Sequence, residues 1–435
     1  MSALPMMHTE SLDLSSVREE RDIVYGEAVV GYGTDKMRNR PLLMNVYLPS
    51  AERFPGPRPA LVLSHGGAYH RGSKDTDEFE QDGSENTPMP EYCRRFAARG
   101  YVCFSVGYRL TQELPAPQAL PIRRSRATVP RGRIDYVREL LGLPRASDDE
   151  LLHGAEAVIA DVAAAFRFVH RHATRWQIDA DRMAIGGFSA GAVASIYATY
   201  ALGVPAAAVI SVSGGMDALD VDYYLHGTRG QPPALLFSSE HDLPGIADRS
   251  KAFSDMAEKR GLGMRHYFVP GKPHFYDHAS PVKLQQSSLP GGPVDSRLEL
   301  ALIDFLDRSL CVPSVTTEML EAFAQAWTRH DIETLMSFMS EDCIFHSSAG
   351  NDASGTRSVG REAVRKAFMN AWADITDASW TRARHFVSGA RGVSEWTLLG
   401  TRKSDGKRIE VDGCDLFTFE GDKIRVKDSW RKQRP

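Results

Sequence analysis

A single serine stands between two glycines in the stretch "AIGGFSAGAVAS" (residues 184–195), where an apolar run meets an alanine-rich one. Gly187-Phe188-Ser189-Ala190-Gly191 fits the pattern G-x-S-x-G. A serine on a sharp turn between a strand and a helix exposes its hydroxyl, and flanking glycines let the chain pass close to itself. Serine is a weak nucleophile at neutral pH until a base takes its proton. The motif therefore predicts that Ser189 is a nucleophile if an acid and a histidine follow it.

Two later segments supply these groups in the order nucleophile, acid, histidine. "ALLFSSEHDLPG" ends an apolar run with Asp242, and "RHYFVPGKPHFYDH" ends another with His274. Each residue stands a few positions beyond its expected strand, which places both at the carboxyl edge of the sheet beside Ser189. Rival groups stand close by in the sequence: Glu240 and Asp277 as acids, and His241 and His278 as bases. The spacing favours Asp242 and His274 and predicts acyl transfer through a Ser-His-Asp triad.

Acyl transfer also needs hydrogen-bond donors for the oxyanion, each worth about 3 kcal/mol. The glycine-rich segment "LSHGGAYHRGS" (residues 63–73) follows an early apolar run. We expect Gly67 and Ala68 to supply two backbone donors and Ala190, next to the nucleophile, to supply a third. His65 is expected to brace this loop rather than to take part in the chemistry.

Apolar runs and amphipathic patterns alternate from about Val24 to Leu310. The predicted strands are residues 60–67, 101–109, 183–189, 207–215, 234–239 and 265–271, and the predicted helices between them are residues 91–100, 155–173 and 248–261. Continuous runs of Val, Ile, Leu and Phe are typical of a parallel sheet covered on both faces. The pattern predicts an α/β fold with a doubly wound, mostly parallel sheet.

Residues 110–154 interrupt this alternation. The segment is rich in proline and arginine and holds one short helical pattern, "DYVRELLGL". We interpret it as an insertion over the sheet and a possible cap, with a surface loop as the alternative. Its basic residues, clustered at 121–133, are interpreted as a solvated or ion-paired face.

The motifs "HGGAYH", "GYRL", "WQIDADRMAIGGFSAGA", "SSEHD" and "GKPHFY" together resemble α/β-hydrolases of the hormone-sensitive-lipase and carboxylesterase type. The resemblance covers roughly the first 310 residues and implies a serine esterase with Ser189, Asp242 and His274 as its triad. Ala68 stands where this family usually has a third loop glycine. We therefore expect a hydrolase domain over residues 24–312, preceded by an N-terminal segment of residues 1–23.

Beyond a linker near residues 311–315 the pattern changes. Helical patterns at residues 316–330, 331–340 and 360–375 enclose a strand at 343–348, and four strand-like runs follow at 379–389, 392–402, 407–420 and 422–432. This order predicts a small α+β domain at residues 314–435. It resembles the SnoaL-like branch of the NTF2-like fold, a curved sheet wrapped by helices into a cone. The resemblance is also the basis for expecting a homodimer.

Strand alternation selects two acids in this domain. Asp415 shares a face with Val411, Phe417 and Phe419, and Asp428 shares one with Ile424, Val426 and Trp430. Burying an unpaired carboxylate on an apolar face costs free energy, so the placement of Asp415 and Asp428 predicts a pocket. The alternative is that both are structural acids paired with other groups. His346 and His385 are candidates for the same pocket, with ordinary hydrogen-bonded strand histidines as the alternative.

Composition limits the remaining possibilities. The 435 residues carry a formal net charge of -4, which gives no attraction to nucleic acid or to an anionic membrane surface. Five scattered cysteines without a CxxC pair favour reduced thiols, and the N-terminus lacks a secretion signal, so we expect a cytoplasmic protein. No metal-ligand spacing and no G-x-G-x-x-G motif is present, and no cofactor is expected.

These observations predict a serine carboxylic-ester hydrolase that acts on a small or medium ester or lactone through an acyl-enzyme. The alternative is a two-domain protein whose cone binds or isomerises a polycyclic or terpenoid ligand. The hydrolase would then cleave an ester, lactone or aryl-amide of the same molecule.

Overall fold

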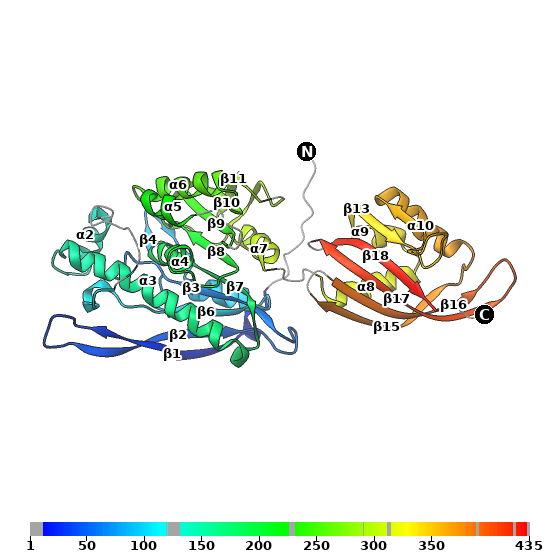
Figure 1. The fold of residues 1–435 in the computed structure, drawn as a ribbon, viewed down its shortest axis with the longest axis horizontal. Helices are drawn as coiled ribbons and strands as arrows, with labels where there is room; N and C mark the ends of the chain where they lie inside the picture. The colour runs from blue at the N-terminus through cyan, green and yellow to red at the C-terminus, as the bar shows by residue number, and fades with distance from the viewer. Residues whose placement is uncertain are drawn as a thin grey trace. The chain divides into compact units, whose positions relative to one another are not determined.

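The computed structural model describes residues 12–118, 120, 131–225, 231–289, 291–310, 315–388, 391–420 and 423–432. The chain divides into two compact units, Met1–Leu310 and Cys311–Pro435 (Figure 1).

The described part of the first unit is built on a ten-stranded sheet in the order β1-β2-β6-β3-β7-β8-β9-β10-β11-β12. The strands are β1 (Arg18–Val30), β2 (Arg38–Leu48), β3 (Arg58–Ser64), β6 (Val102–Val106), β7 (Ile178–Phe188), β8 (Ala208–Val212), β9 (Ala234–His241), β10 (Met264–Pro273), β11 (Pro281–Ser287) and β12 (Asp295–Arg297), with a separate hairpin of β4 (Glu80–Gln81) and β5 (Ser84–Glu85). The strands from β6 to β10 in that order run parallel, and antiparallel strands extend both edges. The predicted α/β fold with a mostly parallel sheet is confirmed.

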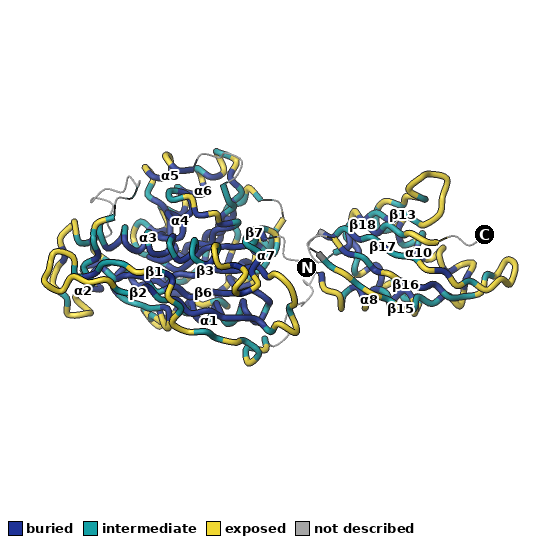
Figure 2. Tube along the Cα trace, turned by 60° about the horizontal axis from the view of Figure 1, so that its bottom comes forward, coloured by how far each residue is buried: buried dark blue, intermediate teal, exposed yellow. Residues whose placement is uncertain are grey.

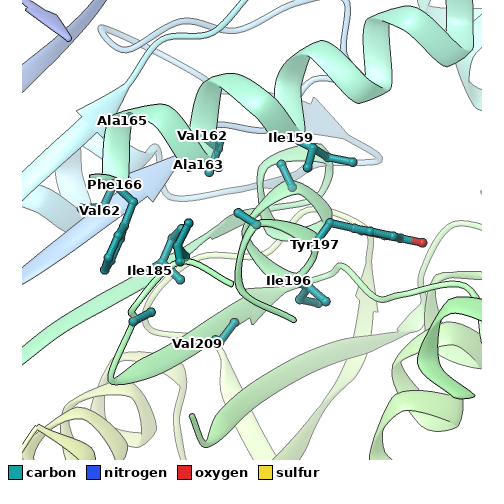
Figure 3. Packing of buried hydrophobic residues seen from close by; sticks show 14 of the residues in the cluster. Val62, Ile159, Val162, Ala163, Ala165, Phe166, Ile185, Ile196, Tyr197 and Val209 are labelled. Atoms are coloured by element: carbon teal, nitrogen blue, oxygen red, sulfur yellow. The ribbon is translucent and has the colours of Figure 1, made fainter. Parts of the chain in front are cut away.

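Helices cover both faces of this sheet: α1 (Met89–Ala97), α2 (Arg131–Leu140), α3 (Asp148–Arg171), α4 (Ala190–Tyr200), α5 (Ala218–Tyr224), α6 (Ile246–Lys259) and α7 (Leu298–Ser309). Every residue of β3 is buried (Figure 2), and successive side chains alternate between the two faces. Val62 belongs to the same hydrophobic cluster as Ile159 of α3 and Ile196 of α4 (Figure 3). Leu61 and Leu63 lie instead beside residues of α1 and α7. The continuous apolar runs of the sequence follow from this burial on both faces.

The described residues between β6 and β7 form a short turn of 3-10 helix, η2 (Thr111–Glu113), then α2, α3 and a second 3-10 turn, η4 (Ala173–Trp176). Helix α3 begins at Asp148, earlier than expected, because Ser147 and Glu150 form a reciprocal cap. The Ser147 hydroxyl accepts from the Glu150 N–H at 3.1 Å, and the Glu150 carboxylate accepts from the Ser147 N–H at 2.6 Å. The predicted cap over residues 110–154 is described only in part, since residues 119 and 121–130 lie outside the described ranges.

The second unit has, among its described residues, a six-stranded sheet in the order β14-β13-β18-β17-β16-β15. Its elements are α8 (Thr317–Thr328), α9 (Ile332–Ser337), β13 (Met339–His346), β14 (Arg357–Val359), α10 (Arg361–Ala373), β15 (Ser379–Ser388), β16 (Arg391–Thr401), β17 (Arg408–Glu420) and β18 (Lys423–Arg431). Only β13 and β18 pair in parallel. Phe323 and Trp327 of α8, Phe368 of α10 and Phe417 of β17 share one core. The predicted α+β cone is confirmed, and the three-residue strand β14 was not expected.

Cys93, Cys103, Cys343 and Cys414 are free thiols, and Cys311 lies outside the described residues. None of the helices in the described ranges combines the length and the apolar character needed to cross a bilayer.

Candidate active site

Ser189 stands between the end of β7 at Phe188 and the start of α4 at Ala190. Its backbone angles are φ 53° and ψ -113°, a left-handed conformation that costs a residue with a Cβ on the order of 1–3 kcal/mol. The N–H of Ser189 donates to the carbonyl of Val212 at the end of β8 at 2.8 Å, which holds the turn. The strand therefore reverses into the helix at this residue, and its side chain projects from a strained turn.

The two glycines of the G-x-S-x-G motif are required by close backbone contacts. A Cβ built on Gly187 would lie 2.3 Å from the carbonyl oxygen of Ser64, and one built on Gly191 would lie 2.2 Å from the same oxygen. Both distances are shorter than any van der Waals contact. The end of β3 thus packs directly against both sides of the serine turn, and this packing excludes any side chain at either glycine.

The structure brings Ser189, His274 and Asp242 together. His274 Nδ1 lies 2.5 Å from Asp242 Oδ1, and His274 Nε2 lies 2.9 Å from Ser189 Oγ. Because a carboxylate only accepts, Nδ1 carries the proton, and Nε2 is left to accept from the serine hydroxyl. The side chains of His274 and Asp242 are buried, whereas Ser189 is partly exposed. This arrangement can transfer a proton from Ser189 to His274 while Asp242 holds the imidazole.

Asp242 accepts three further hydrogen bonds. Its Oδ2 accepts from the Ser213 hydroxyl at 2.7 Å and from the Ser239 N–H at 3.2 Å, and its Oδ1 accepts from the Leu243 N–H at 2.8 Å. Burial alone would raise the pKa of Asp242, but the hydrogen bonds from His274 and Ser213 outweigh burial and lower the pKa below its usual value. The carboxylate is therefore kept ionised beside the imidazole.

Ser213 and Tyr276 are site residues that sequence reasoning missed. The Ser213 hydroxyl gives its proton to Asp242, so its oxygen accepts from the Tyr276 hydroxyl at 2.7 Å. Both side chains are buried. The position of Ser213 just beyond β8, at the strand edge that also carries Ser189, is the signal that could have identified it.

The rival acids and bases have other partners. Glu240 accepts from the Gly271 N–H, Asp277 accepts from the Ala279 N–H and the Ser280 hydroxyl, and His278 Nδ1 lies 3.0 Å from the Thr87 hydroxyl. His241 is exposed at the end of β9.

The glycine-rich loop after β3 lies against the serine turn. A Cβ built on Gly66 would meet the Phe188 ring at 2.5 Å, so this loop touches the residue that precedes Ser189. Gly67 and Ala68 have positive φ angles of 113° and 54°. Within the described ranges, the N–H groups of Gly67, Ala68 and Ala190 donate no hydrogen bond to another backbone group. The role of these three N–H groups as oxyanion donors stays a prediction.

Buried side chains hold the loop in this conformation. His65 stacks on Tyr108 with ring centroids 3.9 Å apart, and burial lowers the pKa of His65 to about 4. The Tyr108 hydroxyl donates to the carbonyl of His65 at 2.8 Å. Asp77, which sequence reasoning missed among ordinary loop acids, accepts from the N–H groups of Gly66 at 3.2 Å and Met89 at 2.7 Å. Burial raises the pKa of Asp77 to about 6.

A second candidate site is a cavity of about 350 Å³ in the C-terminal unit, lined by aromatic residues such as Trp327 and Trp396 and by Asp415. Asp415 is buried and forms an ion pair with Lys427 at 2.7 Å. The Asp415 carboxylate also accepts from Ser429 at 2.5 Å and from the Trp396 indole at 3.0 Å. Burial lowers the pKa of Lys427, although Asp415 opposes this effect.

The other three residues proposed for this pocket do not line the cavity. The register of β18 shifts beside Thr418 and Phe419, so Lys427 and Ser429 face the cavity instead of Asp428. His385 is hydrogen-bonded to Ser394 at 2.8 Å and to Glu321 at 3.0 Å. His346 ends β13 opposite Asp428.

Comparisons with known proteins agree with this division. Residues 320–426 match the family model for the SnoaL-like domain, and residues 150–203 match the BD-FAE family model. No curated protein matches the sequence. Among solved structures, a thermophilic esterase from Thermogutta terrifontis is similar at 17% identity over 60% of this chain and 84% of its own, with a TM-score of 0.39. A protein with a ketosteroid isomerase-like fold from Catenulispora acidiphila is similar at 21% identity over 27% of this chain and 86% of its own, with a TM-score of 0.24. The first unit thus contains a segment similar to the BD-FAE family, and the second unit contains one similar to the SnoaL-like domain.

Proposed function

We propose that the first unit is a serine carboxylic-ester hydrolase whose catalytic residues are Ser189, His274 and Asp242. The single observation that carries the proposal is the hydrogen-bonded chain from Ser189 through His274 to Asp242, which starts at a strained serine turn. The geometry matches the requirement that a nucleophile lie within hydrogen-bond reach of a base that a third group orients.

The reaction follows from these positions. His274 Nε2 takes the Ser189 proton while the serine oxygen attacks the ester carbonyl carbon. The N–H groups of Gly67, Ala68 and Ala190 bind the developing oxyanion, and Asp242 stabilises the imidazolium. His274 then protonates the departing alcohol as the bond to it breaks, which leaves an acyl group on Ser189. Water, activated by His274, releases the acid and restores the serine.

The test is hydrolysis of 4-nitrophenyl esters from acetate to decanoate by the wild type and by Ser189→Ala. We expect turnover of the shorter esters in the wild type and a loss of at least about 10³-fold in the variant. Turnover that survives the substitution would refute the role of Ser189. A wild type inactive on every chain length would refute a general esterase and favour a lactone or an aryl-amide substrate.

A second candidate function belongs to the C-terminal unit, where the cavity of about 350 Å³ favours it. Its tryptophan walls suit a flat polycyclic ligand, and its size lies at the lower end of the range typical of ligand sites. Titration with the polycyclic ketone 9-fluorenone, followed by tryptophan fluorescence, tests this function. We expect saturable quenching that weakens in Trp396→Leu. Quenching that grows linearly and equally in both proteins would exclude a site.

The small-molecule ester substrate follows from the proposed hydrolysis. The homodimer and the cytoplasmic location stay predictions. Sedimentation velocity over a hundredfold range of concentration would test the first, and fractionation of cells that express the full chain would test the second.

A further inference from the structure

Two arginines beside the proposed active site, Arg71 and Arg133, have no acidic partner among the residues that the structure describes. Arg71 follows the glycine-rich loop, and its side chain begins against Gly67: a Cβ built on that glycine would lie 3.0 Å from Arg71 Cγ. The guanidinium carbon of Arg71 lies 4.2 Å from the ring centroid of Phe79. Arg71 is therefore anchored at the residue proposed to bind the oxyanion.

Arg133 reaches the same place from α2, in the segment between β6 and β7. Its guanidinium carbon lies 5.6 Å from the ring centroid of Phe275, the residue that follows His274. The rings of Phe79 and Phe275 are themselves neighbours, with centroids 5.9 Å apart. Both cations thus lie over one aromatic pair at the edge of the proposed triad.

Neither charge is neutralised within the part of the chain that the structure describes. Arg71 Nε is buried without an acceptor, and Arg133 makes one long hydrogen bond, 3.5 Å to the Gln81 amide oxygen. No ion pair joins either guanidinium to a described carboxylate. Burial lowers the pKa of both arginines, and the charge of Arg133 adds to this effect at Arg71. Arginine nevertheless stays charged at neutral pH.

Two other arginines of the same segment, Arg131 and Arg138, have partners. Arg131 forms ion pairs with Asp135 and Asp148. Arg138 is buried and donates to His70 Nε2 at 3.0 Å and to the carbonyl of Pro144 at 2.6 Å. These contacts attach α2 to the glycine-rich loop. Arg71 and Arg133 differ from them because they are partly desolvated and have no described carboxylate beside them. A buried cation in this state is unfavourable unless an anion binds.

We propose that Arg71 and Arg133 bind a carboxylate of the substrate, so that the preferred ester carries a free carboxylate on its acyl part. A guanidinium matches a carboxylate through two parallel hydrogen bonds. The aromatic pair beneath the cations would cover the carbon chain between this carboxylate and the scissile ester. The inference rests on the proposed ester hydrolysis and adds a substrate class to it.

The test compares two esters that differ mainly in charge, 4-nitrophenyl hydrogen adipate and 4-nitrophenyl hexanoate. We expect the wild type to show a kcat/KM at least tenfold higher for the anionic ester. In Arg71→Gln and Arg133→Gln this ratio is expected to fall at least tenfold, and Arg71→Lys is expected to give an intermediate ratio. Arg145→Gln is the matched control, because Arg145 is an exposed arginine of the same segment and should leave the ratio unchanged.

The outcomes separate the two proposals. Equal kcat/KM values for the two esters in a wild type that depends on Ser189 would overturn the carboxylate site and keep the hydrolase. An equal fall of the ratio in Arg145→Gln would also overturn it, because a general field of positive charge would then explain the preference. Turnover independent of Ser189 would instead overturn the hydrolase itself.

Discussion

At the level of single residues, the ionised state of Asp242 depends on neighbours far from it in the sequence. Tyr276 donates to Ser213, and Ser213 donates to Asp242, so two hydroxyl groups support the carboxylate that holds His274. A hydrogen bond to a charged group contributes about 1.5–3 kcal/mol. This support keeps a buried carboxylate negative where burial alone would favour its protonation.

Ser213→Ala should therefore lower kcat/KM for a 4-nitrophenyl ester by about tenfold, which corresponds to about 1.4 kcal/mol. Ser239→Ala is the matched control. Its hydroxyl is buried without a partner, and its N–H, which donates to Asp242, stays in place. Steady-state kinetics on both variants test the network. Equal losses in the two, or none in Ser213→Ala, would show that the Ser213 hydroxyl does not support the carboxylate.

Asp77 gives a prediction about stability and pH. Its pKa is raised to about 6 in the folded protein, from 3.8 in the unfolded chain, so the folded state binds the proton more tightly. The contribution of Asp77 to the free energy of unfolding should be largest below about pH 4 and fall by up to about 3 kcal/mol as the pH rises through 6. Urea unfolding of the wild type and of Asp77→Asn at pH 4.5 and 7 measures it. The free energy of unfolding of the wild type, relative to that of the variant, should be higher at pH 4.5 than at pH 7. A difference between the two proteins that does not change with pH would contradict the prediction.

These residues mark what the sequence can and cannot predict about the site. The sequence predicts Ser189, Asp242 and His274 as site residues because each follows an apolar strand, and parallel strands end at one edge of the sheet. The sequence does not predict Asp77 and Tyr276 as site residues, because their importance comes from hydrogen bonds to distant loops. No local spacing distinguishes Asp77 from the exposed Glu78 beside it.

At the level of elements, the serine turn works because β3 passes within contact distance of the start of α4. Gly191 is the second residue of α4, and Gly132 is the second residue of α2. A Cβ on Gly191 would lie 2.2 Å from the Ser64 carbonyl oxygen, whereas a Cβ on Gly132 meets nothing within 4 Å. The same helix position is thus closed to a side chain in one helix and open in the other.

Gly191→Ala should displace the turn, lower kcat/KM at least about 100-fold and lower the thermal midpoint, since a shift of 1 Å at a reacting group can cost that much. Gly132→Ala should keep the activity and leave the midpoint unchanged or slightly raised, because alanine favours a helix by roughly 1 kcal/mol. Circular dichroism melting and ester kinetics on both variants measure the effects. Full activity in Gly191→Ala would show that β3 does not constrain the turn.

Strand β18 shows why the alternation of side chains along a strand does not by itself predict which residues are buried. Counting by two from Ile424 places Asp428 on the buried face, but the pairing with β17 shifts beside Phe419, and Lys427 is buried instead. An irregularity of one residue exchanges the two faces of a strand beyond it. The lysine could enter the cavity wall because Asp415 on β17 supplies its counter-charge.

At the level of the whole molecule, each unit has a hydrophobic core of its own, one around the ten-stranded sheet and one around the aromatic residues of the cone. The sequence predicted this division from the change of pattern near residue 311, since alternating strands and helices give way there to helices followed by hairpins. A chain with two separate cores can unfold in two steps rather than one.

Asp415→Asn should separate these steps. Removing one partner of a buried ion pair costs about 3–5 kcal/mol, because Lys427 is left without its counter-charge. The unfolding transition of the second unit should therefore move to lower temperature, while the temperature at which ester turnover is lost, which reports the first unit, stays constant. Calorimetry and residual activity after heating measure the two. Glu333→Gln, which breaks the exposed pair with Arg365, should move neither. A joint shift of both temperatures would mean that the two cores unfold as one.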